Sequence, residues 1–546
     1  MRSRVLLVTF LAACTQQAPA AVAKDTTPRL VVLLVIDQWP TWSFLDREPL
    51  LHKGIGRLLH EGTVFPRARY PYASTYTAPG HAALSTGAPP SVTGVINNEW
   101  YDRDEGKPVE SIADSGYLML AVGGWRGELV DPSRPRISGW RLRVDGIGDV
   151  LKAATRGKAR AVGVSLKNRA AIFATGRHAD LAIWYDDGQR AFTTSSWYAR
   201  ELPGWLERIA HDQPIGPRLA DDWVPLDAAL LARAAHVPDD APGEARNTTF
   251  GATFPHRALA LSNPAESIKQ APLGDTVVVE AALAAVDGEE LGKHDAPDYL
   301  AVSFSVHDYI GHEYGQESWE ELDDLLRLDA SIGALLDGLE ARLGAGRVAV
   351  VLTSDHGAPR MPDAHPGTVR VDVANVARAA EAAMRPIVGP GSILDYDRDP
   401  TLYVTRRVRL LPPEVRERAL DAAVAAIQKV PGIGYAARTD LVGPADGTCA
   451  GRPEAEAALC LAIDRERSGE IFFGPGPGSL ILDREGDAIS HGSANDDDRL
   501  VPVILWGPGV PAGRHETVVS TLQVAPTLAR FLAIPPPPGA HEPPLP

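Results

Sequence analysis

The chain has 546 residues, of which 45% are hydrophobic and 23% charged, and its formal net charge is −16. These proportions are typical of soluble globular proteins and exclude a mostly disordered chain, a fibre or a polytopic membrane protein. An acidic chain is also a poor candidate for holding nucleic acid as a stable partner, because lysine and arginine supply most of that affinity. Three cysteines are too few for a structural zinc finger.

The first 23 residues are typical of an export signal. Two arginines precede the apolar run 5–13, which is too short to span a bilayer but fits the hydrophobic region of a secretory signal peptide. Residues 11–14 resemble a bacterial lipobox, in which Cys14 would carry the lipid, and ordinary cleavage after residues 21–23 is the alternative. The sequence therefore predicts an exported protein that is periplasmic, anchored by lipid to the outer membrane, or secreted.

Apolar, β-branched runs predict buried strands along the mature chain. They span residues 30–36, 161–166, 299–305, 348–353 and 501–506. Helical patterns lie between them: Ser318 and Glu321 form a capping-box pattern that opens a helix ending near Gly344, and a second helix runs from Pro412 to about Val430. Buried strands that alternate with helices predict an α/β fold with a doubly wound, mostly parallel central sheet.

Two stretches interrupt this alternation. Residues of about 186–295 and about 365–480 are rich in proline, glycine and aspartate and lack a clean order of strands and helices. We interpret them as insertions that decorate one catalytic domain over residues 28–534. The proline-rich tail, residues 535–546, is expected to be extended and mobile.

Acidic and imidazole side chains gather at the ends of the predicted strands. In open α/β sheets, ligands bind at the carboxyl ends of strands. The side chains near these positions are Asp37, Asp308, His312, Asp355, His356 and His491. Each alone has a plain structural explanation, such as a helix N-cap. Together they are enough for two metal ions with three protein ligands each, and mixed Asp/His ligation suits zinc and other borderline divalent metals.

The segment 70–98 contains a candidate nucleophile. Pro79 predicts the start of a helix and Gly87 its end, so Thr77 is expected just ahead of that helix. A helix N-terminus offers free backbone N–H groups to an anion. A hydroxyl held there beside a metal can be deprotonated and attack phosphorus. The alternative is that Thr77 only caps the helix.

These residues, in this order, resemble the alkaline phosphatase superfamily. The similar branch uses a threonine nucleophile and includes nucleotide pyrophosphatases/phosphodiesterases and a group of secreted bacterial alkaline phosphatases. The resemblance runs from residue 30 to 531 and rests on Asp37, Thr77-Ala78-Pro79-Gly80-His81, Asn98, Asp308 with His312, Asp355-His356-Gly357 and Ser490-His491-Gly492. It implies an alkaline-phosphatase-like three-layer α/β/α sandwich with inserted cap or crown segments.

The resemblance also implies two Zn²⁺ ions per chain and a phosphothreonine intermediate on Thr77. One ion would be held by Asp37, Asp355 and His356, with Thr77 as a fourth ligand, and the other by Asp308, His312 and His491. Asn98 would donate a hydrogen bond to a non-bridging oxygen of the phosphoryl group.

Lys167 and Arg169 bear on which ester is cleaved. A phosphate monoester carries an extra anionic oxygen that must be neutralised, whereas a diesterase prefers an apolar pocket there. The two cations resemble the Lys-x-Arg element of the monoesterase group, and alternation along an extended segment would put both on one side, where they could bind one phosphoryl group. The alternative is that both are solvated charges at a strand end.

The sequence therefore favours a phosphate monoester hydrolase that acts on small-molecule phosphate monoesters. A phosphodiesterase/nucleotide pyrophosphatase on the same scaffold, or a non-catalytic lipoprotein that binds metal or phosphate, are the alternatives. A membrane would be contacted only through the lipid on Cys14. Once Cys14 is removed or lipidated, Cys449 and Cys460 remain, 11 positions apart. In an oxidising compartment they can pair as a disulfide, and two unpaired thiols are the alternative.

Overall fold

The computed structural model describes residues 27–122, 135–244, 250–258, 266–398, 400–444, 448–482 and 486–546. The expected signal peptide and Cys14 lie outside these ranges. None of the helices in the described ranges combines the length and the hydropathy that a membrane-spanning helix needs.

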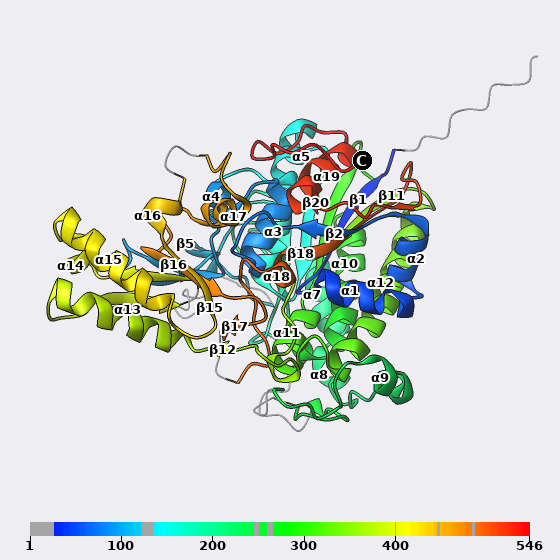
Figure 1. The fold of residues 1–546 in the computed structure, drawn as a ribbon. Helices are drawn as coiled ribbons and strands as arrows, with labels where there is room; N and C mark the ends of the chain where they lie inside the picture. The colour runs from blue at the N-terminus through cyan, green and yellow to red at the C-terminus, as the bar shows by residue number, and fades with distance from the viewer. Residues whose placement is uncertain are drawn as a thin grey trace, which may run out of the picture.

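A 10-stranded mixed sheet forms the centre of the molecule (Figure 1). Its order is β19-β2-β18-β11-β1-β10-β7-β8-β9, with β20 also paired to β2. The short strands at this edge are β19 (Gly513–Arg514) and β20 (Val519–Ser520). The group β11, β1, β10, β7 and β8 is parallel, whereas β18 and β9 pair antiparallel with their neighbours. The main strands are β1 (Leu30–Ile36), β2 (Thr63–Arg69), β7 (Ala161–Ser165), β8 (Leu181–Asp186), β9 (Ala191–Thr193), β10 (Asp298–Phe304), β11 (Val348–Thr353) and β18 (Leu500–Trp506). Every strand expected from the sequence is confirmed, with ends shifted by at most one residue.

Helices cover both faces of the sheet, because alternate side chains of its central strands point to opposite sides. All of β1 is buried: Val32 and Leu34 belong to one apolar core, and Leu33 and Val35 to another. The first core is closed by α2 (Gly54–Glu61), α10 (Leu273–Gly288) and α12 (Trp319–Leu343), and the second by α3 (Thr77–Thr86), α5 (Ile147–Thr155) and α19 (Val524–Leu532). The expected three-layer α/β/α sandwich is therefore confirmed.

The helix boundaries follow local capping chemistry. The Ser318 hydroxyl accepts a hydrogen bond from the backbone N–H of Glu321 at 3.1 Å and so caps α12, which ends at Gly344 as predicted. Gly87 ends α3 in the left-handed region, at φ 67°. The second expected helix is α15 (Pro413–Ile427), with proline at its first turn.

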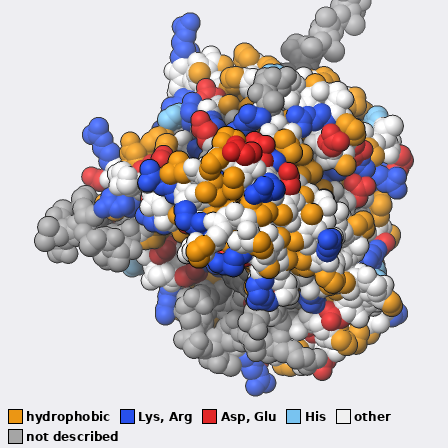
Figure 2. Space-filling model, turned by 60° about the vertical axis from the view of Figure 1, so that its left-hand side comes forward, with side chains coloured by type: hydrophobic (Ala, Val, Ile, Leu, Met, Phe, Trp, Pro, Cys, Tyr) orange, Lys and Arg blue, Asp and Glu red, His pale blue; other side chains and the backbone are white. Residues whose placement is uncertain are grey.

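Residues 370–438 and 471–481 form a compact part of their own, which we call the inserted module. Its antiparallel sheet has the order β13-β14-β16-β15 and packs against two helices around a separate apolar core. The elements are α13 (Val373–Val388), β13 (Leu394–Arg398), β14 (Thr401–Val404), α15, β15 (Ile433–Arg438) and β16 (Ile471–Pro475). The module extends to the left of the main sheet in Figure 1. Figure 2 brings this side forward and shows basic, acidic and apolar side chains interspersed on the surface.

The other interruption of the strand–helix order is shorter than the expected stretch 186–295. The segment 204–234 carries the short helices α7 (Gly204–Asp212), α8 (Ile215–Arg218) and α9 (Ala228–Ala234). However, α10 lies on the main sheet, where it contacts β7, β10 and α12. Its Val278, Ala282 and Ala285 are fully buried, so this apolar helix belongs to the central sandwich.

The proline-rich tail is packed, which corrects the expectation of a mobile end. Leu545 is fully buried against α19. Its N–H donates to the hydroxyl of Thr527 at 2.8 Å, and Arg530 donates to its carbonyl oxygen at 2.6 Å. One buried leucine with two hydrogen bonds holds the segment in place, although proline prevents it from joining a sheet or helix.

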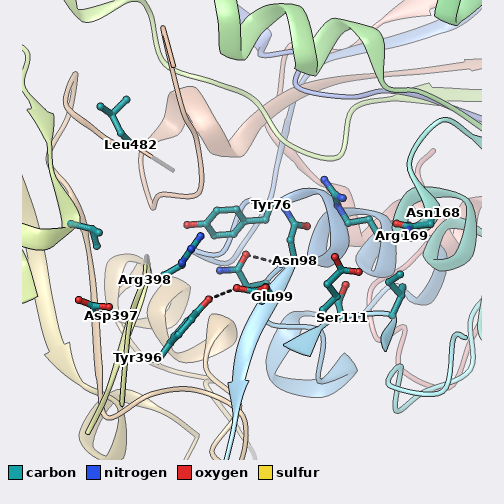
Figure 3. A pocket seen from close by; sticks show the side chains of 14 residues that line it. Tyr76, Asn98, Glu99, Ser111, Asn168, Arg169, Tyr396, Asp397, Arg398 and Leu482 are labelled. Carbon is teal, nitrogen blue, oxygen red and sulfur yellow. Dashed lines mark hydrogen bonds between the residues drawn. The ribbon is translucent and has the colours of Figure 1, made fainter. Parts of the chain in front are cut away.

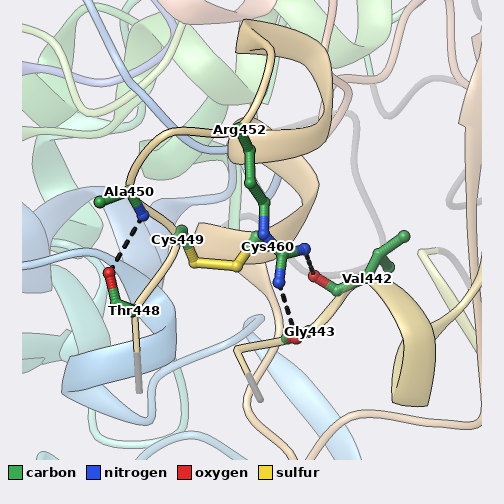
Figure 4. The surroundings of a disulfide bond; sticks show 7 residues. All are labelled: Val442, Gly443, Thr448, Cys449, Ala450, Arg452 and Cys460. Atoms are coloured by element: carbon green, nitrogen blue, oxygen red, sulfur yellow. Dashed lines mark hydrogen bonds between the residues drawn. A yellow bond between two sulfur atoms is a disulfide. The ribbon is translucent and has the colours of Figure 1, made fainter. Parts of the chain in front are cut away.

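Cys449 and Cys460 are joined by a disulfide in the structure (Figure 4). The bond ties the loop before α17 (Glu454–Ala462) to the helix itself, in which Cys460 is fully buried. Arg452, inside the same loop, donates to the carbonyl oxygens of Val442 and Gly443. The loop is therefore attached on two sides.

Candidate active site and metal centre

The aspartates and histidines expected to bind metal converge at one edge of the sheet. Asp37 directly follows β1, Asp355 and His356 follow β11, and Asp308 lies in α11 (Val306–Tyr314), the helix after β10. Because β1 pairs with both β10 and β11 in parallel, their carboxyl ends meet at the same edge. His312 is one helical turn after Asp308, and His491 arrives from the segment before β18.

The first cluster comprises Asp37, Asp355 and His356, all fully buried. His356 Nε2 lies 3.4 Å from Asp37 Oδ1 and 3.4 Å from Asp355 Oδ2. None of these three atoms has a hydrogen-bond partner among the described residues. Tetrahedral zinc with ligand distances of about 2.0–2.1 Å requires ligand atoms about 3.3–3.4 Å apart. The observed spacing and the unpartnered atoms therefore fit a zinc ion.

The second cluster is centred on Asp308. Its Oδ1 lies 3.4 Å from His312 Nε2 and 3.4 Å from His491 Nε2. His356 borders this cluster as well, since Asp308, His356 and His491 place ligand atoms within 4.8 Å of one another and the rings of His356 and His491 stack at 3.7 Å. The two clusters are thus adjacent, and His356 lies between them, which residue spacing did not indicate.

Backbone carbonyls orient all three imidazole rings. The Nδ1 atoms of His312, His356 and His491 lie 2.9, 3.0 and 2.8 Å from the carbonyl oxygens of Ile489, Gly357 and Thr75. A carbonyl only accepts hydrogen bonds, so each Nδ1 carries the proton. In its neutral form each ring then has its lone pair on Nε2, the atom that faces the carboxylates, as metal-ligating histidines require.

The buried carboxylates of these clusters favour positive charge nearby. Burial alone would lower the pKa of His356, but the carboxylates of Asp355 and Asp37 raise it to about 9. Burial, together with the nearby His356, lowers the pKa of His491 to about 3. The buried carboxylates therefore favour positive charge at this position, which is the charge that a divalent metal would supply.

Thr77 and Asn98 lie together at the start of α3. Thr77 is the first residue of the helix, one position inside the boundary we expected, and is 1% exposed. The Asn98 side-chain oxygen accepts a hydrogen bond from the backbone N–H of Ala78 at 2.9 Å, which leaves its NH₂ group to donate. Gly80 allows α3 to approach the backbone of Asp355 closely, because a Cβ atom there would lie 2.2 Å from the carbonyl oxygen of Asp355.

Lys167 bridges the two clusters. Its Nζ lies 2.7 Å from Asp37 Oδ2 and 3.5 Å from Thr77 Oγ1, and it also donates to Asp308. Burial would lower the pKa of Lys167, but Asp308 and Asp37 raise it above its ordinary value. The side chain is therefore a buried ammonium that donates toward the threonine hydroxyl.

Arg169 is not on an extended segment, so the alternation argument was wrong. The strand β7 ends at Ser165, and α6 (Asn168–Thr175) begins directly after Lys167. Arg169 therefore lies in the first turn of a helix, where side chains are spaced by 100° rather than alternating. It still borders the same cavity as Asn98 and lies near enough to Lys167 to affect its pKa.

Gln38 is a site residue that the sequence analysis missed. It has a positive φ of 66° and is fully buried. Its backbone N–H donates to Asp355 Oδ1 at 3.3 Å, and its side-chain NH₂ donates to Asp308 Oδ1 at 2.9 Å. Gln316 in turn donates to the Gln38 side-chain oxygen at 3.0 Å. Gln38 thus ties ligands of both clusters together, and the only signal in the sequence was its position after Asp37.

A cavity of 490 Å³ opens at Tyr76, the residue that precedes Thr77 (Figure 3). Tyr76, Asn98 and Arg169 line it from the central sandwich. Tyr396 and Arg398 line it from β13 of the inserted module. The cavity therefore lies between the start of α3, next to the candidate nucleophile, and the module.

Comparison with known proteins places this site in a family. The family described as type I phosphodiesterase / nucleotide pyrophosphatase matches residues 31–494, a span that includes every residue expected to bind metal. The chain belongs to this family. The resemblance to the alkaline phosphatase superfamily is thereby confirmed, in the branch that includes the nucleotide pyrophosphatases/phosphodiesterases.

Curated relatives of this family member match over nearly the whole chain. Alkaline phosphatase PafA of Elizabethkingia meningoseptica is 29% identical over 95% of this chain and 94% of its own. A protein named calcium-transporting ATPase, of Myroides odoratus, is 28% identical over 98% of this chain and 97% of its own. Alkaline phosphatase PhoK of Sphingomonas sp is 29% identical over 94% and 89%. The crystal structure of wild-type PafA superposes with a TM-score of 0.85 and 27% identity, covering 95% of this chain and 98% of PafA.

Proposed function

We propose that the chain is a metal-dependent phosphate monoester hydrolase of the alkaline phosphatase type, with Thr77 as its nucleophile. The observation that carries this proposal is the position of Lys167, a buried ammonium 3.5 Å from Thr77 Oγ1. A phosphate monoester presents one more anionic oxygen at phosphorus than a diester does, and a cation beside the nucleophile neutralises it. The relatives named alkaline phosphatase support the same activity.

Two zinc ions are the cofactors of this proposal. Asp37, Asp355 and His356, with Thr77, would hold one, and Asp308, His312 and His491 the other. When bound, such ions lower the pKa of a coordinated hydroxyl or water and stabilise the attacking and leaving oxygens. The mixed carboxylate and imidazole donors, and the Nε2 atoms directed at the carboxylates, support zinc.

Thr77 and the residues around it account for the bond changes and for binding of the phosphoryl oxygens in this proposal. Thr77 Oγ attacks phosphorus in line, so that an Oγ–P bond forms while the ester P–O bond breaks and the leaving oxygen departs with its electron pair. Water then attacks the phosphothreonine, the Oγ–P bond breaks, and inorganic phosphate and free Thr77 result. Asn98 NH₂ and the Arg169 guanidinium donate to non-bridging oxygens, and Lys167 stabilises the growing negative charge.

A phosphodiesterase or nucleotide pyrophosphatase is the second candidate, because the matching family carries that description. A non-catalytic lipoprotein that binds metal or phosphate is less well supported, since binding alone needs no buried threonine at a helix N-terminus beside a lysine. The substrates in the first proposal are small-molecule phosphate monoesters.

Export belongs to the same proposal. The arginines and the apolar run within residues 1–23 support a signal peptide, with Cys14 as the site of a lipid anchor or lost with the signal. The disulfide between Cys449 and Cys460 supports an oxidising compartment such as the periplasm or the outside of the cell.

Paired kinetics on a monoester and a diester test the proposal. The protein is purified, its metal content is measured, and kcat/KM is compared for 4-nitrophenyl phosphate and bis(4-nitrophenyl) phosphate. About two equivalents of zinc and a preference for the monoester of at least about 10²-fold are expected. A preference for the diester would favour the second candidate, and no turnover of either ester would favour the non-catalytic one.

A further inference from the structure

We propose that the preferred substrate carries a second anionic group on its leaving group, and that Arg398 of the inserted module binds it. This inference rests on the proposed monoesterase function. It adds a substrate class, an anionic alcohol or phenol esterified to phosphate, and a residue that selects it.

The cavity is larger than the reacting group requires. At 490 Å³ it lies within the range of about 300–1,000 Å³ that is usual for sites of small organic ligands. Asn98 and Arg169, which are proposed to hold the phosphoryl group, lie on one side, and Tyr396 and Arg398 lie on the other (Figure 3). A substrate whose phosphoryl group is bound at Thr77 therefore extends its leaving group toward β13.

Geometry along β13 directs Arg398 into this space. Residues two apart on a strand share a face, so Tyr396 and Arg398 point to the same side and Asp397 to the other. The Tyr396 hydroxyl donates to Glu99 Oε1 at 2.6 Å, which shows that this side faces the central sandwich. Tyr396 is further held by stacking on Tyr101 at 6.1 Å. The face that presents Arg398 is therefore supported by a fixed aromatic side chain.

The Arg398 side chain has no hydrogen bond or ion pair in the described part of the chain, whereas the Arg407 and Arg438 side chains of the same module are engaged. Arg407 donates to two carbonyl oxygens, and Arg438 to two aspartates. Arg169 Nε, across the cavity, is likewise buried without a hydrogen-bond partner among the described residues. Two unengaged guanidinium groups on opposite sides of one cavity fit a ligand with two anionic groups, since each planar fork binds a carboxylate or phosphate in two-point geometry.

The acidic residues of the lining provide an argument for the opposite preference, a cationic leaving group. Glu99 is bound to the Tyr396 hydroxyl, and Asp397 also lines the cavity, although alternation along β13 directs its side chain to the other face. Glu110, an exposed residue of the lining, would instead favour a cationic leaving group. The charge that the cavity selects is therefore measurable by varying the leaving group alone.

The test uses the full zinc-loaded protein and a series of phenyl phosphates. The para substituent is hydrogen, carboxylate, phosphonate or trimethylammonium, and kcat/KM is measured for each with wild type, Arg398→Ala, Arg398→Lys and Arg406→Ala. Arg406 is an exposed arginine of the module that does not line the cavity, so it is the matched control. Comparing ratios between proteins cancels the intrinsic reactivity of each ester.

The ratio of kcat/KM for the carboxylated ester over phenyl phosphate should fall about 10-fold in Arg398→Ala, mainly through KM, and should be unchanged in Arg406→Ala. Arg398→Lys should restore part of it, and a larger loss with the phosphonate than with the carboxylate would identify a phosphate as the second group. An unchanged ratio in Arg398→Ala, or a wild-type preference for the trimethylammonium ester, would overturn the inference. Wild-type turnover of phenyl phosphate itself tests the monoesterase function separately.

Discussion

The central sandwich and the inserted module differ in how they contribute to the site. The candidate ligands Asp37, Asp308 and Asp355 lie just past the ends of neighbouring parallel strands and are 3% exposed or less. The module instead presents exposed side chains, such as Arg398, from an antiparallel sheet with its own apolar core. The side chains that need the most exact positions thus lie on the buried sandwich, next to the ends of its strands. One wall of the cavity, by contrast, belongs to the separately packed module.

The comparison is tested most severely by replacing Thr77. Thr77→Ala should lower kcat for a phosphate monoester by about 10³-fold or more, because it removes the hydroxyl that forms the covalent intermediate in the proposed function. Steady-state release of nitrophenol measures it, and Thr77→Ser, which keeps the hydroxyl, is the matched control. Undiminished turnover in Thr77→Ala would show that Thr77 is not the nucleophile.

Removal of metal should affect hydrogen exchange in the sandwich and in the module differently. Treatment with a chelator should abolish activity, and added Zn²⁺ should restore it, because the candidate ligands lie in the sandwich alone. Hydrogen exchange followed by mass spectrometry should accelerate in peptides that contain Asp37, Asp308 and Asp355, since bound metal stabilises only the folded ends of these strands. Peptides from β14 and β16 of the module should be unaffected. Equal acceleration in both regions would show that they unfold as one unit.

Lys167→Ala sharpens the assignment within the sandwich. The loss of this buried ammonium should lower kcat/KM for a monoester by about 10²–10³-fold and for a diester by less than about 10-fold, because the diester lacks the oxygen that Lys167 neutralises. Kinetics on both esters measure the difference, with the exposed Lys158→Ala as control. Equal losses on the two esters would contradict the monoesterase assignment.

The smallest effect concerns the packed tail. Leu545→Ala should lower the free energy of unfolding by about 1–2 kcal/mol, less than an average buried leucine because the chain end can relax. Urea denaturation measures it, and Leu410→Ala, at a leucine that is 72% exposed, is the control. If both variants have the stability of the wild type, Leu545 does not contribute as its burial indicates.

Much of the sandwich could be predicted because its signals are local. Runs of β-branched residues are long enough to identify strands such as β1 and β11, and the residue after each strand is located by the same pattern. Asp37, Asp355 and His356 therefore came together as expected. To predict that the candidate metal ligands lie together, only the rule that parallel strands end at one edge was needed, and it applies whatever the order of strands in the sheet.

Features that depend on contacts far apart in the sequence could not be predicted. Arg169 was misplaced because the end of β7 and the start of α6 differ by only a few residues, within which strand and helix periodicities cannot be told apart. The role of Gln38 depends on Asp308, which is 270 positions away. The mobility of the tail was predicted from its prolines, whereas its packing depends on the contact between one leucine and α19.

The sequence by itself determined the α/β class, the identities of the candidate ligands and nucleophile, and the family, because these depend on residue type and on short-range periodicity. The net charge of −16 describes the whole chain and does not reveal that Lys167 lies beside Thr77. Only the tertiary structure decided that Lys167 enters between Asp37 and Asp308 beside Thr77, that His356 borders both clusters, and that Arg398 faces Arg169 across one cavity. Such distances are set by the packing of whole layers and of the module, and residue order along the chain does not encode them separately.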